Sequence, residues 1–255
     1  MSDQTDKKPI EKITDAAGQA ARAEIEPVPV RRSRTTLFMV ALVVVAVAFA
    51  VLTFLVKTMP FFAVDLQITR AIQLINFPSF GLLMNLISWP GFGPQDVIIA
   101  GLIILLILIF SLRWEAIVAL IAALFTTGID LLVKDLVQRP RPLPNQVNVF
   151  AKLSSFSFPS GHVMFYLGFF GFIWFLAFTL LKPSLKRSFL LVLFGILIVL
   201  VGVSRVYLGE HWPSDVLGSY LLGSLTLVAI IQFYLWGKKR FFVHQPVAPA
   251  EPQKK

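Results

Sequence analysis

Long apolar runs, separated by short polar stretches, dominate the chain between residues 37 and 236. A helix that crosses a bilayer needs about 20 mostly apolar residues. Backbone groups in lipid must form their hydrogen bonds within the segment, so such runs are expected to be helices. The pattern therefore predicts an all-α integral membrane bundle of six transmembrane helices. They lie at about residues 37–56, 96–112, 115–136, 162–181, 188–206 and 214–236.

Residues 57–95 have a different pattern. From Asp65 to Ile75, apolar residues recur near helical spacing with Asp, Gln and Arg between them. Pro78 and Pro90 bracket a second stretch of this kind. Two short helices at the membrane interface would explain the pattern. A loop outside the membrane, packed on the bundle, would explain it equally well, so both interpretations stay open.

The composition also indicates a membrane protein. Of 255 residues, 56% are hydrophobic and 15% are charged, whereas soluble domains have about 25% charged residues. Thirteen of the 37 charged residues lie in residues 1–36 and six lie in residues 237–255, which leaves 18 for the 200 residues between them. So few charges cannot cover a soluble globule. We therefore expect a membrane domain at 37–236, between a polar, disordered leader (1–36) and a basic tail (237–255).

The net charge of +9 does not indicate a nucleic-acid-binding protein, because no basic stripe with interleaved aromatic residues is present. The cations lie mainly at the ends of apolar segments, ten on one side of the predicted bundle and seven on the other. Cytoplasmic loops are richer in Lys and Arg. This predicts a multi-pass membrane protein with both termini in the cytoplasm. The chain has no cysteine, which excludes disulfides and thiolate sites.

Polar residues gather at three predicted helix ends. Lys134 and Arg139-Pro140-Arg141-Pro142 end the third segment, and Pro159-Ser160-Gly161-His162 begins the fourth. Ser204-Arg205 ends the fifth, and His211 and Asp215 follow before the sixth. Because spans alternate in direction, these ends must lie on the same side of the membrane.

The residue types at these ends suit a phosphate. A helix that starts after Ser160 points free N–H groups and the positive end of its dipole outward, and Gly161 lets a ligand approach the backbone. The arginines and the lysine add charged donors. His211 and Asp215 are four residues apart, so a carboxylate can fix the imidazole tautomer and leave one nitrogen as nucleophile or base. His162, at a helix start, is free to protonate a leaving oxygen.

Together the three motifs resemble the signature of the type 2 phosphatidic acid phosphatases, the PAP2 family, which shares a core with the vanadium haloperoxidases. The matching residues are Lys134 with Arg141-Pro142, Pro159 to His162, and Ser204-Arg205 with His211 and Asp215. The resemblance implies that His211 forms a phosphohistidine, that Asp215 orients it, and that His162 protonates the leaving group and then helps to activate water. It further implies a protein of the cell (inner) membrane with its active site outside the cytoplasm, no metal and no cofactor. The phosphate ligands would be Lys134, Arg141, Ser160, the Gly161 amide and Arg205.

These expectations lead to a membrane phosphatase that acts on a lipid phosphate or diphosphate held in the bilayer. Undecaprenyl diphosphate is the first substrate to consider, followed by phosphatidate and phosphatidylglycerol phosphate. A lipid phosphotransferase that uses the same site is an alternative, and a lipid or ion transporter is a more distant one. The oligomeric state is not predicted.

Three further polar residues lie near the motifs. Asp130 lies one helical turn before Lys134 and should pair with it. Arg139 should contact the substrate head group or a side chain behind the site. Glu210 precedes His211, and its helical phase places it at the rim of the site.

Overall fold

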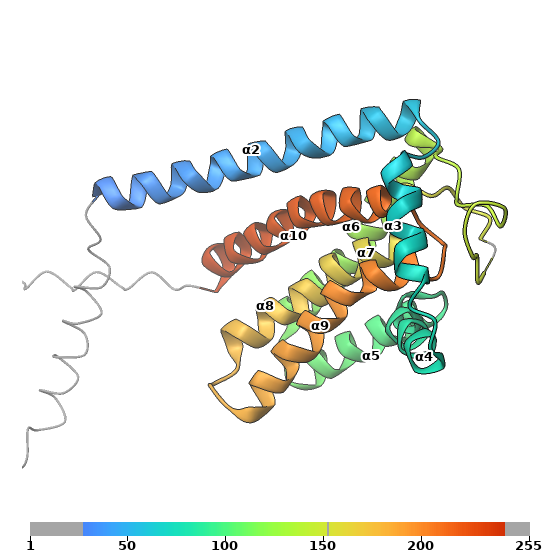
Figure 1. Cartoon of the computed structure of the whole chain (residues 1–255). Helices are drawn as coiled ribbons and strands as arrows, with labels where there is room; N and C mark the ends of the chain where they lie inside the picture. The colour runs from blue at the N-terminus through green and yellow to red at the C-terminus, as the bar shows by residue number, and fades with distance from the viewer. Residues whose placement is uncertain (1–27, 152, 243–255) are drawn as a thin grey trace, which may run out of the picture. The chain divides into compact units, whose positions relative to one another are not determined.

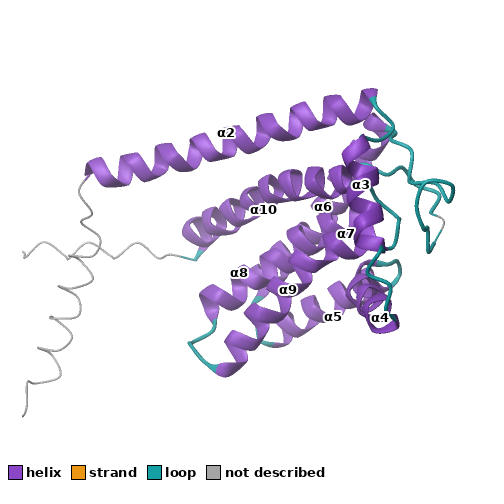
Figure 2. Ribbon diagram, viewed as in Figure 1, coloured by secondary structure: helices purple, strands orange, loops and turns teal. Residues whose placement is uncertain are grey.

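The computed structural model describes residues 28–151 and 153–242 (Figure 1). Most of the predicted leader, and residues 243–255 of the predicted tail, lie outside this range. Within it the chain forms helices and loops without strands (Figure 2). The chain divides into two units, residues 1–44 and residues 45–255. In the first unit, the apolar side chains from Leu37 to Val44 on helix α2 (Val28–Thr58) are mostly exposed.

Five helices in the described part are long and apolar enough to cross a membrane. They are Thr35–Thr58 within α2, α6 (Arg113–Val137), the continuous helix Gly161–Leu180, α9 (Leu185–Tyr207) and α10 (Pro213–Phe241). All-helical architecture and membrane spans agree with the sequence-based prediction.

The sixth span differs from the prediction. Helix α5 (Gln95–Ile109) has 15 residues, a length of about 22 Å, and cannot alone cross a hydrocarbon core of about 30 Å. It qualifies as a span only together with Pro78–Gly91, to which it is joined at a bend of 63°. Pro90 and Pro94 break the helix here, because proline lacks the N–H that a helix interior requires.

The segment between the first two predicted spans contains two short helices, α3 (Ala63–Gln73) and α4 (Pro78–Ser88). Pro78 is the first residue of α4, a position where proline costs no hydrogen bond. Both helices pack on α9, and α3 also contacts α10. The segment is therefore helical, as the first interpretation expected, and packs on the bundle, as the second expected, while its position at the membrane interface stays a prediction. The buried face of α3 includes Asp65 and Thr69.

The helix Gly161–Leu180 lies at the centre of the core. It consists of α7 (Gly161–Phe165), one π-helical turn (Tyr166–Phe170) and α8 (Gly171–Leu180). Tyr166, Phe169 and Phe172 are fully buried in it, and α6, α9 and α10 pack around it. The packing is close, since a Cβ on Gly168 would overlap the side chain of Thr126. The start of this helix, which carries the second motif, is thus held by three neighbouring helices.

Candidate active site

The three motifs meet at one end of the bundle. Lys134, near the end of α6, donates a hydrogen bond to the carbonyl oxygen of Pro159 (2.7 Å). Arg141, in the loop after α6, donates to the carbonyl oxygen of Glu210 (2.6 Å). Beside them lies a cavity of about 270 Å³. Five of the eight predicted site residues line this cavity, namely Lys134, Arg141, Gly161, His162 and His211.

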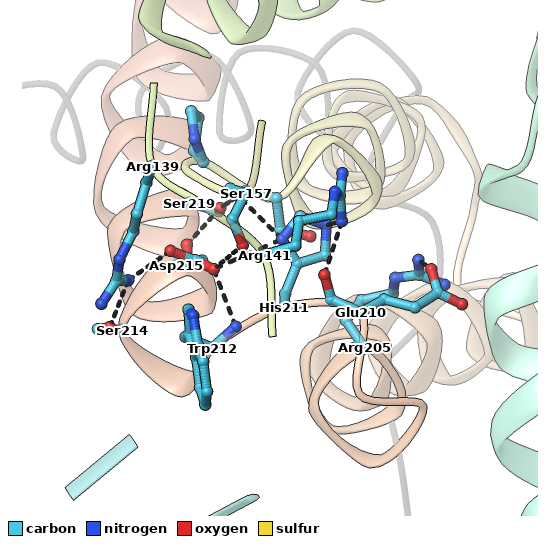
Figure 3. Close-up of polar contacts among 12 residues, drawn as sticks. Arg139, Arg141, Ser157, Arg205, Glu210, His211, Trp212, Ser214, Asp215 and Ser219 are labelled. Carbon is cyan, nitrogen blue, oxygen red and sulfur yellow. Dashed lines mark hydrogen bonds and ion pairs between the residues drawn. The ribbon is translucent and has the colours of Figure 1, made fainter. Parts of the chain in front are cut away.

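His211 lies in the loop between α9 and α10 and is buried (Figure 3). Its Nδ1 is 2.7 Å from the carbonyl oxygen of Ser157. A carbonyl oxygen only accepts hydrogen bonds, so Nδ1 carries the hydrogen and Nε2 carries the lone pair. Arg141 Nη1 lies 3.2 Å from Nε2 and donates to it. The tautomer predicted for a nucleophile is present, and the backbone of Ser157 sets it.

Asp215 does not make the predicted hydrogen bond to His211. Its carboxylate lies 3.7 Å from Nδ1, beyond hydrogen-bond range. It accepts instead from the Ser157 hydroxyl (2.5 Å), the Trp212 amide (2.8 Å) and Arg139 Nη1 (2.5 Å). Asp215 lies in the first turn of α10, where a carboxylate binds the free N–H groups of the helix start. These donors surround the carboxylate, and Ser157 links it to the imidazole in place of a direct hydrogen bond.

The surroundings of His211 favour the neutral imidazole. Burial lowers the pKa of His211 well below its ordinary value, and the nearby cations Arg141, Arg205 and Lys134 lower it further. The hydrogen bond to Ser157 acts in the opposite direction but is a smaller effect. At neutral pH the ring therefore keeps the Nε2 lone pair, which accepts from Arg141 in this structure.

The start of α7 offers free polar groups. Ser160 occupies the N-cap position, but its side chain makes no capping hydrogen bond. Its hydroxyl oxygen and His162 Nε2 are both buried without a hydrogen-bond partner among the described residues. The His162 ring packs edge-on against Phe92, 4.6 Å between ring centres. A Cβ on Gly161 would lie 3.0 Å from the Asp130 carboxylate. Buried polar atoms are normally bonded, so the Ser160 hydroxyl and His162 Nε2 are candidates to bind a ligand.

Two of the predicted phosphate ligands already have full sets of partners. Lys134 donates to both oxygens of Asp130 (2.5 and 2.7 Å), which confirms that predicted pair. Besides Glu210 and His211, Arg141 donates to the Ser155 carbonyl and hydroxyl oxygens (2.7 and 2.9 Å) and to the Phe156 carbonyl oxygen (3.2 Å). A phosphate bound by these two side chains would therefore have to replace partners that they have in this structure.

Arg205 lies behind the cavity wall. It is fully buried, donates to the Ser88 hydroxyl, forms an ion pair with Glu210 and lies 5.0 Å from the centre of the Phe92 ring. Its Nε has no hydrogen-bond partner among the described residues. The structure thus brings Arg205 next to the motif residues, one layer behind those that line the cavity.

The prediction that Glu210 lies at the rim is wrong. Its side chain is buried and pairs with Arg205. The helical phase does not apply, because α9 ends at Tyr207 and Gly209 has a left-handed φ of +66°. Gly209 is required there, since a Cβ would overlap the backbone of Asn148. The turn at Gly209 directs the Glu210 side chain inward.

Sequence reasoning missed two residues behind His211, namely Ser157 and Asp65, whereas one of the two contacts expected for Arg139 is the one found. Ser157 has no place in the three motifs, yet it contacts both His211 and Asp215. Arg139 is buried and bonds to Asp215 and to Asp65 of α3, so it contacts side chains behind the site. The one available signal was Asp65, a carboxylate within an otherwise apolar helical pattern. Among the described residues no group of three or more His, Asp or Glu side chains is arranged to hold a metal ion.

Comparisons with known proteins agree with the motifs. The family model described as the PAP2 superfamily matches residues 112–239. Phosphatidylglycerophosphatase B of Bacillus subtilis is 31% identical over 191 residues, 72% of this chain and 90% of that protein. An undecaprenyl-diphosphatase of Sulfolobus acidocaldarius is 44% identical over 75 residues, 29% of this chain and 31% of that protein.

Solved structures share the fold. The crystal structure of a transmembrane PAP2-type phosphatidylglycerolphosphate phosphatase from Bacillus subtilis aligns with 78% of this chain and 98% of its own, with a TM-score of 0.68 and 28% identity. LpxE of Aquifex aeolicus aligns with 67% of this chain and 96% of its own, with a TM-score of 0.53 and 22% identity, and supports the fold alone. From its motifs, its family match and its relatives, this chain is a multi-pass membrane protein that belongs to the PAP2 superfamily.

Proposed function

We propose that this chain is a membrane lipid phosphatase that hydrolyses a lipid phosphate through a phosphohistidine at His211. The observation that carries the proposal is the state of His211. Its Nδ1–H is bound to the Ser157 carbonyl oxygen, which leaves the lone pair on Nε2, and His211 lines a cavity together with His162, Lys134 and Arg141. A nucleophile, an acid and two cations around one cavity suit phosphoryl transfer.

In the first half of the reaction, His211 Nε2 attacks phosphorus with its lone pair. As the N–P bond forms, the P–O bond to the lipid breaks and its electron pair stays on the leaving oxygen. His162, which enters this step as the imidazolium, gives a proton to that oxygen and becomes neutral, so the lipid leaves as an alcohol. The cations Lys134 and Arg141, the Ser160 hydroxyl and the Gly161 N–H donate to the phosphoryl oxygens. For this step, Arg141 exchanges its contact with His211 Nε2 for one with the phosphate.

In the second half, water attacks phosphorus from the side that the lipid has left. His162, now neutral, takes a proton from this water. The N–P bond breaks, its electron pair returns to Nε2, and inorganic phosphate leaves. Arg205 supports both steps from behind the cavity wall. Its positive charge stabilises the negative charge of the phosphoryl group in the transition state. Both histidines thus return to the protonation states in which they started.

The substrate we propose is phosphatidylglycerol phosphate. The relative and the solved structure that cover most of this chain carry that activity in their names, whereas the undecaprenyl-diphosphatase match covers 75 residues. This reverses the order of substrates expected from the sequence. Leu131, Met164 and Phe165 give the cavity an apolar wall, against which an acyl chain can pack while the phosphate meets the cations.

The decisive experiment measures phosphate release by purified protein in detergent with excess EDTA. Phosphatidylglycerol phosphate, undecaprenyl diphosphate and phosphatidate are assayed in parallel, with His211→Asn as the control. We expect metal-independent release, fastest from phosphatidylglycerol phosphate, and none above background from the variant. Retention of more than a small part of the activity by His211→Asn would disprove the nucleophile assignment. Loss of donor lipid without free phosphate would instead indicate a phosphotransferase.

A further inference from the structure

A buried cluster of three charged residues lies behind His211, and one of its members is outside the PAP2 match. Arg139 Nη1 donates to Asp215 at 2.5 Å, and Arg139 Nη2 donates to Asp65 at 3.0 Å. Asp65 belongs to α3, Arg139 to the loop after α6 and Asp215 to the start of α10. The Arg139 and Asp215 side chains are fully buried, and that of Asp65 is 2% exposed.

Asp65 and Arg139 each make further hydrogen bonds in this cluster. Asp65 also accepts from the Phe62 amide (3.1 Å), the Ser214 amide (2.9 Å) and the Ser214 hydroxyl (2.7 Å). Arg139 Nε donates to the Pro60 carbonyl oxygen (3.0 Å), and its Nη1 also donates to the Ser214 hydroxyl (2.7 Å). Two carboxylates thus share one guanidinium, so the negative charge of Asp215 is not fully neutralised by Arg139.

The cluster reaches the imidazole through Ser157. The Ser157 hydroxyl donates to Asp215 (2.5 Å), its amide donates to the Arg139 carbonyl oxygen (2.8 Å), and its own carbonyl oxygen accepts from His211 Nδ1 (2.7 Å). Arg139 therefore fixes the acceptor of His211 in two ways, through its backbone and through its side-chain bond to Asp215. Asp65 is the group that holds the other end of the Arg139 side chain.

We propose that Asp65 is a positioning residue for His211, acting through Arg139, Asp215 and Ser157. The inference rests on the proposed role of His211 as nucleophile. As the N–P bond forms, the imidazole ring gains positive charge, and the carboxylate 3.7 Å away stabilises it. By sharing Arg139, Asp65 keeps Asp215 negative enough for this task and holds the Ser157 carbonyl oxygen in place.

The first test replaces Asp65 by Asn and measures kcat and KM on phosphatidylglycerol phosphate. An amide cannot accept from all four donors that now bind the carboxylate. We expect kcat to fall on the order of tenfold to hundredfold, the range typical when the hydrogen-bond partners of metal-binding side chains are removed, while KM changes little. Asp65→Glu keeps the charge and should recover part of the loss. Asp135→Asn, at an exposed carboxylate of α6, is the matched control and should leave kcat unchanged.

The second readout is the acidic limb of the kcat/KM profile, which reports protonation of His211. The charged or titratable groups that face His211 are Asp215 from α10, Arg141 from the loop, Arg205 from α9, Lys134 from α6 and His162 from α7. Loss of the Asp65 charge makes these surroundings more positive, which disfavours the protonated ring. The limb should therefore move to lower pH in Asp65→Asn and stay in place in Asp135→Asn.

Ser214→Ala keeps the test decisive if Asp65→Asn does not fold. This variant removes the hydroxyl that joins Asp65 to Arg139 and leaves all three charges. We expect kcat to fall several-fold with KM unchanged. Wild-type kcat in Ser214→Ala, or a folded Asp65→Asn with wild-type kcat or an unmoved acidic limb, would overturn the positioning role. An inactive wild-type protein would instead overturn the proposed function itself.

Discussion

The Nδ1 atom of His211 lies 2.7 Å from the backbone carbonyl oxygen of Ser157. Because this acceptor belongs to the backbone, it cannot be protonated and cannot be removed by a side-chain substitution. The tautomer that exposes Nε2 is therefore independent of the charge state of nearby carboxylates. This separates the two tasks that the sequence motif assigns to one aspartate, since Ser157 fixes the ring and Asp215 contributes charge.

This separation predicts a limited effect of Asp215→Asn. Where a carboxylate itself holds the tautomer of a catalytic histidine, its conversion to an amide lowers kcat by about 10⁴. Here the tautomer survives, so the loss should stay well below that value. Ser157→Ala keeps the carbonyl oxygen and removes one donor to Asp215, and its loss should be smaller again. Steady-state kcat of both variants checks the order, and a loss of about 10⁴ in Asp215→Asn would contradict it.

A second prediction distinguishes the roles of His162 and His211 by comparing substrates with different leaving groups. If His162 protonates the departing lipid oxygen, its replacement should matter most where that oxygen is a poor leaving group. We expect His162→Asn to lower the rate on a lipid phosphate far more than the rate of the first step on p-nitrophenyl phosphate, measured as a burst of p-nitrophenolate. His211→Asn should abolish both reactions. Equal losses on the two substrates in His162→Asn would exclude the proton-donor role.

The pH dependence follows from burial of His211. Protonation consumes the Nε2 lone pair, and burial lowers the pKa of His211. Activity should therefore persist below the ordinary histidine value of about 6.5 and be lost as pH falls through the lowered pKa. The kcat/KM profile of the free enzyme measures this limb. An acidic limb at or above about 6.5 would show that the imidazole is not shielded as the structure indicates.

Much of the site could be predicted because its parts are local. The spans follow from apolar runs, and alternation of the spans places Lys134, His162 and His211 at one end. The pair of Asp130 and Lys134 follows from their four-residue spacing on α6. Each of these inferences needs only neighbours in sequence or the direction of a helix.

The remaining features depend on contacts that no residue type encodes. The Ser157 acceptor is a backbone atom, and Asp65 meets Arg139 across 74 residues. The burial of Glu210 depends on the left-handed Gly209, which ends the helix and changes its phase. The short α5 depends on the bend near Pro90 and Pro94. Tertiary packing decides these features, so periodicity could not reveal them.

Glu210 is a further target for mutation. Its carboxylate pairs with the buried Arg205, while its carbonyl oxygen binds Arg141. Glu210→Gln keeps the backbone contact and removes a negative charge behind the phosphate cavity. Inorganic phosphate should then inhibit several-fold more strongly, because less negative charge opposes it. Arg205 loses its charged partner, so the thermal unfolding temperature in detergent should fall. Unchanged inhibition by phosphate would show that the charge of Glu210 does not act on the phosphate site.

The proposed orientation can be tested with single cysteines, because the natural chain contains none. Asn145 is exposed in the loop between α6 and α7, at the same end as the active site, and Lys182 is exposed in the loop between α8 and α9. With cytoplasmic termini and six spans, the first loop lies outside the cytoplasm and the second inside. A membrane-impermeant maleimide should label Asn145→Cys in intact spheroplasts and Lys182→Cys only after permeabilisation. Both variants must retain phosphatase activity for the assay to report the native topology. The reverse labelling pattern would place the active site in the cytoplasm, and the substrate phosphate would then have to be presented from the inner leaflet.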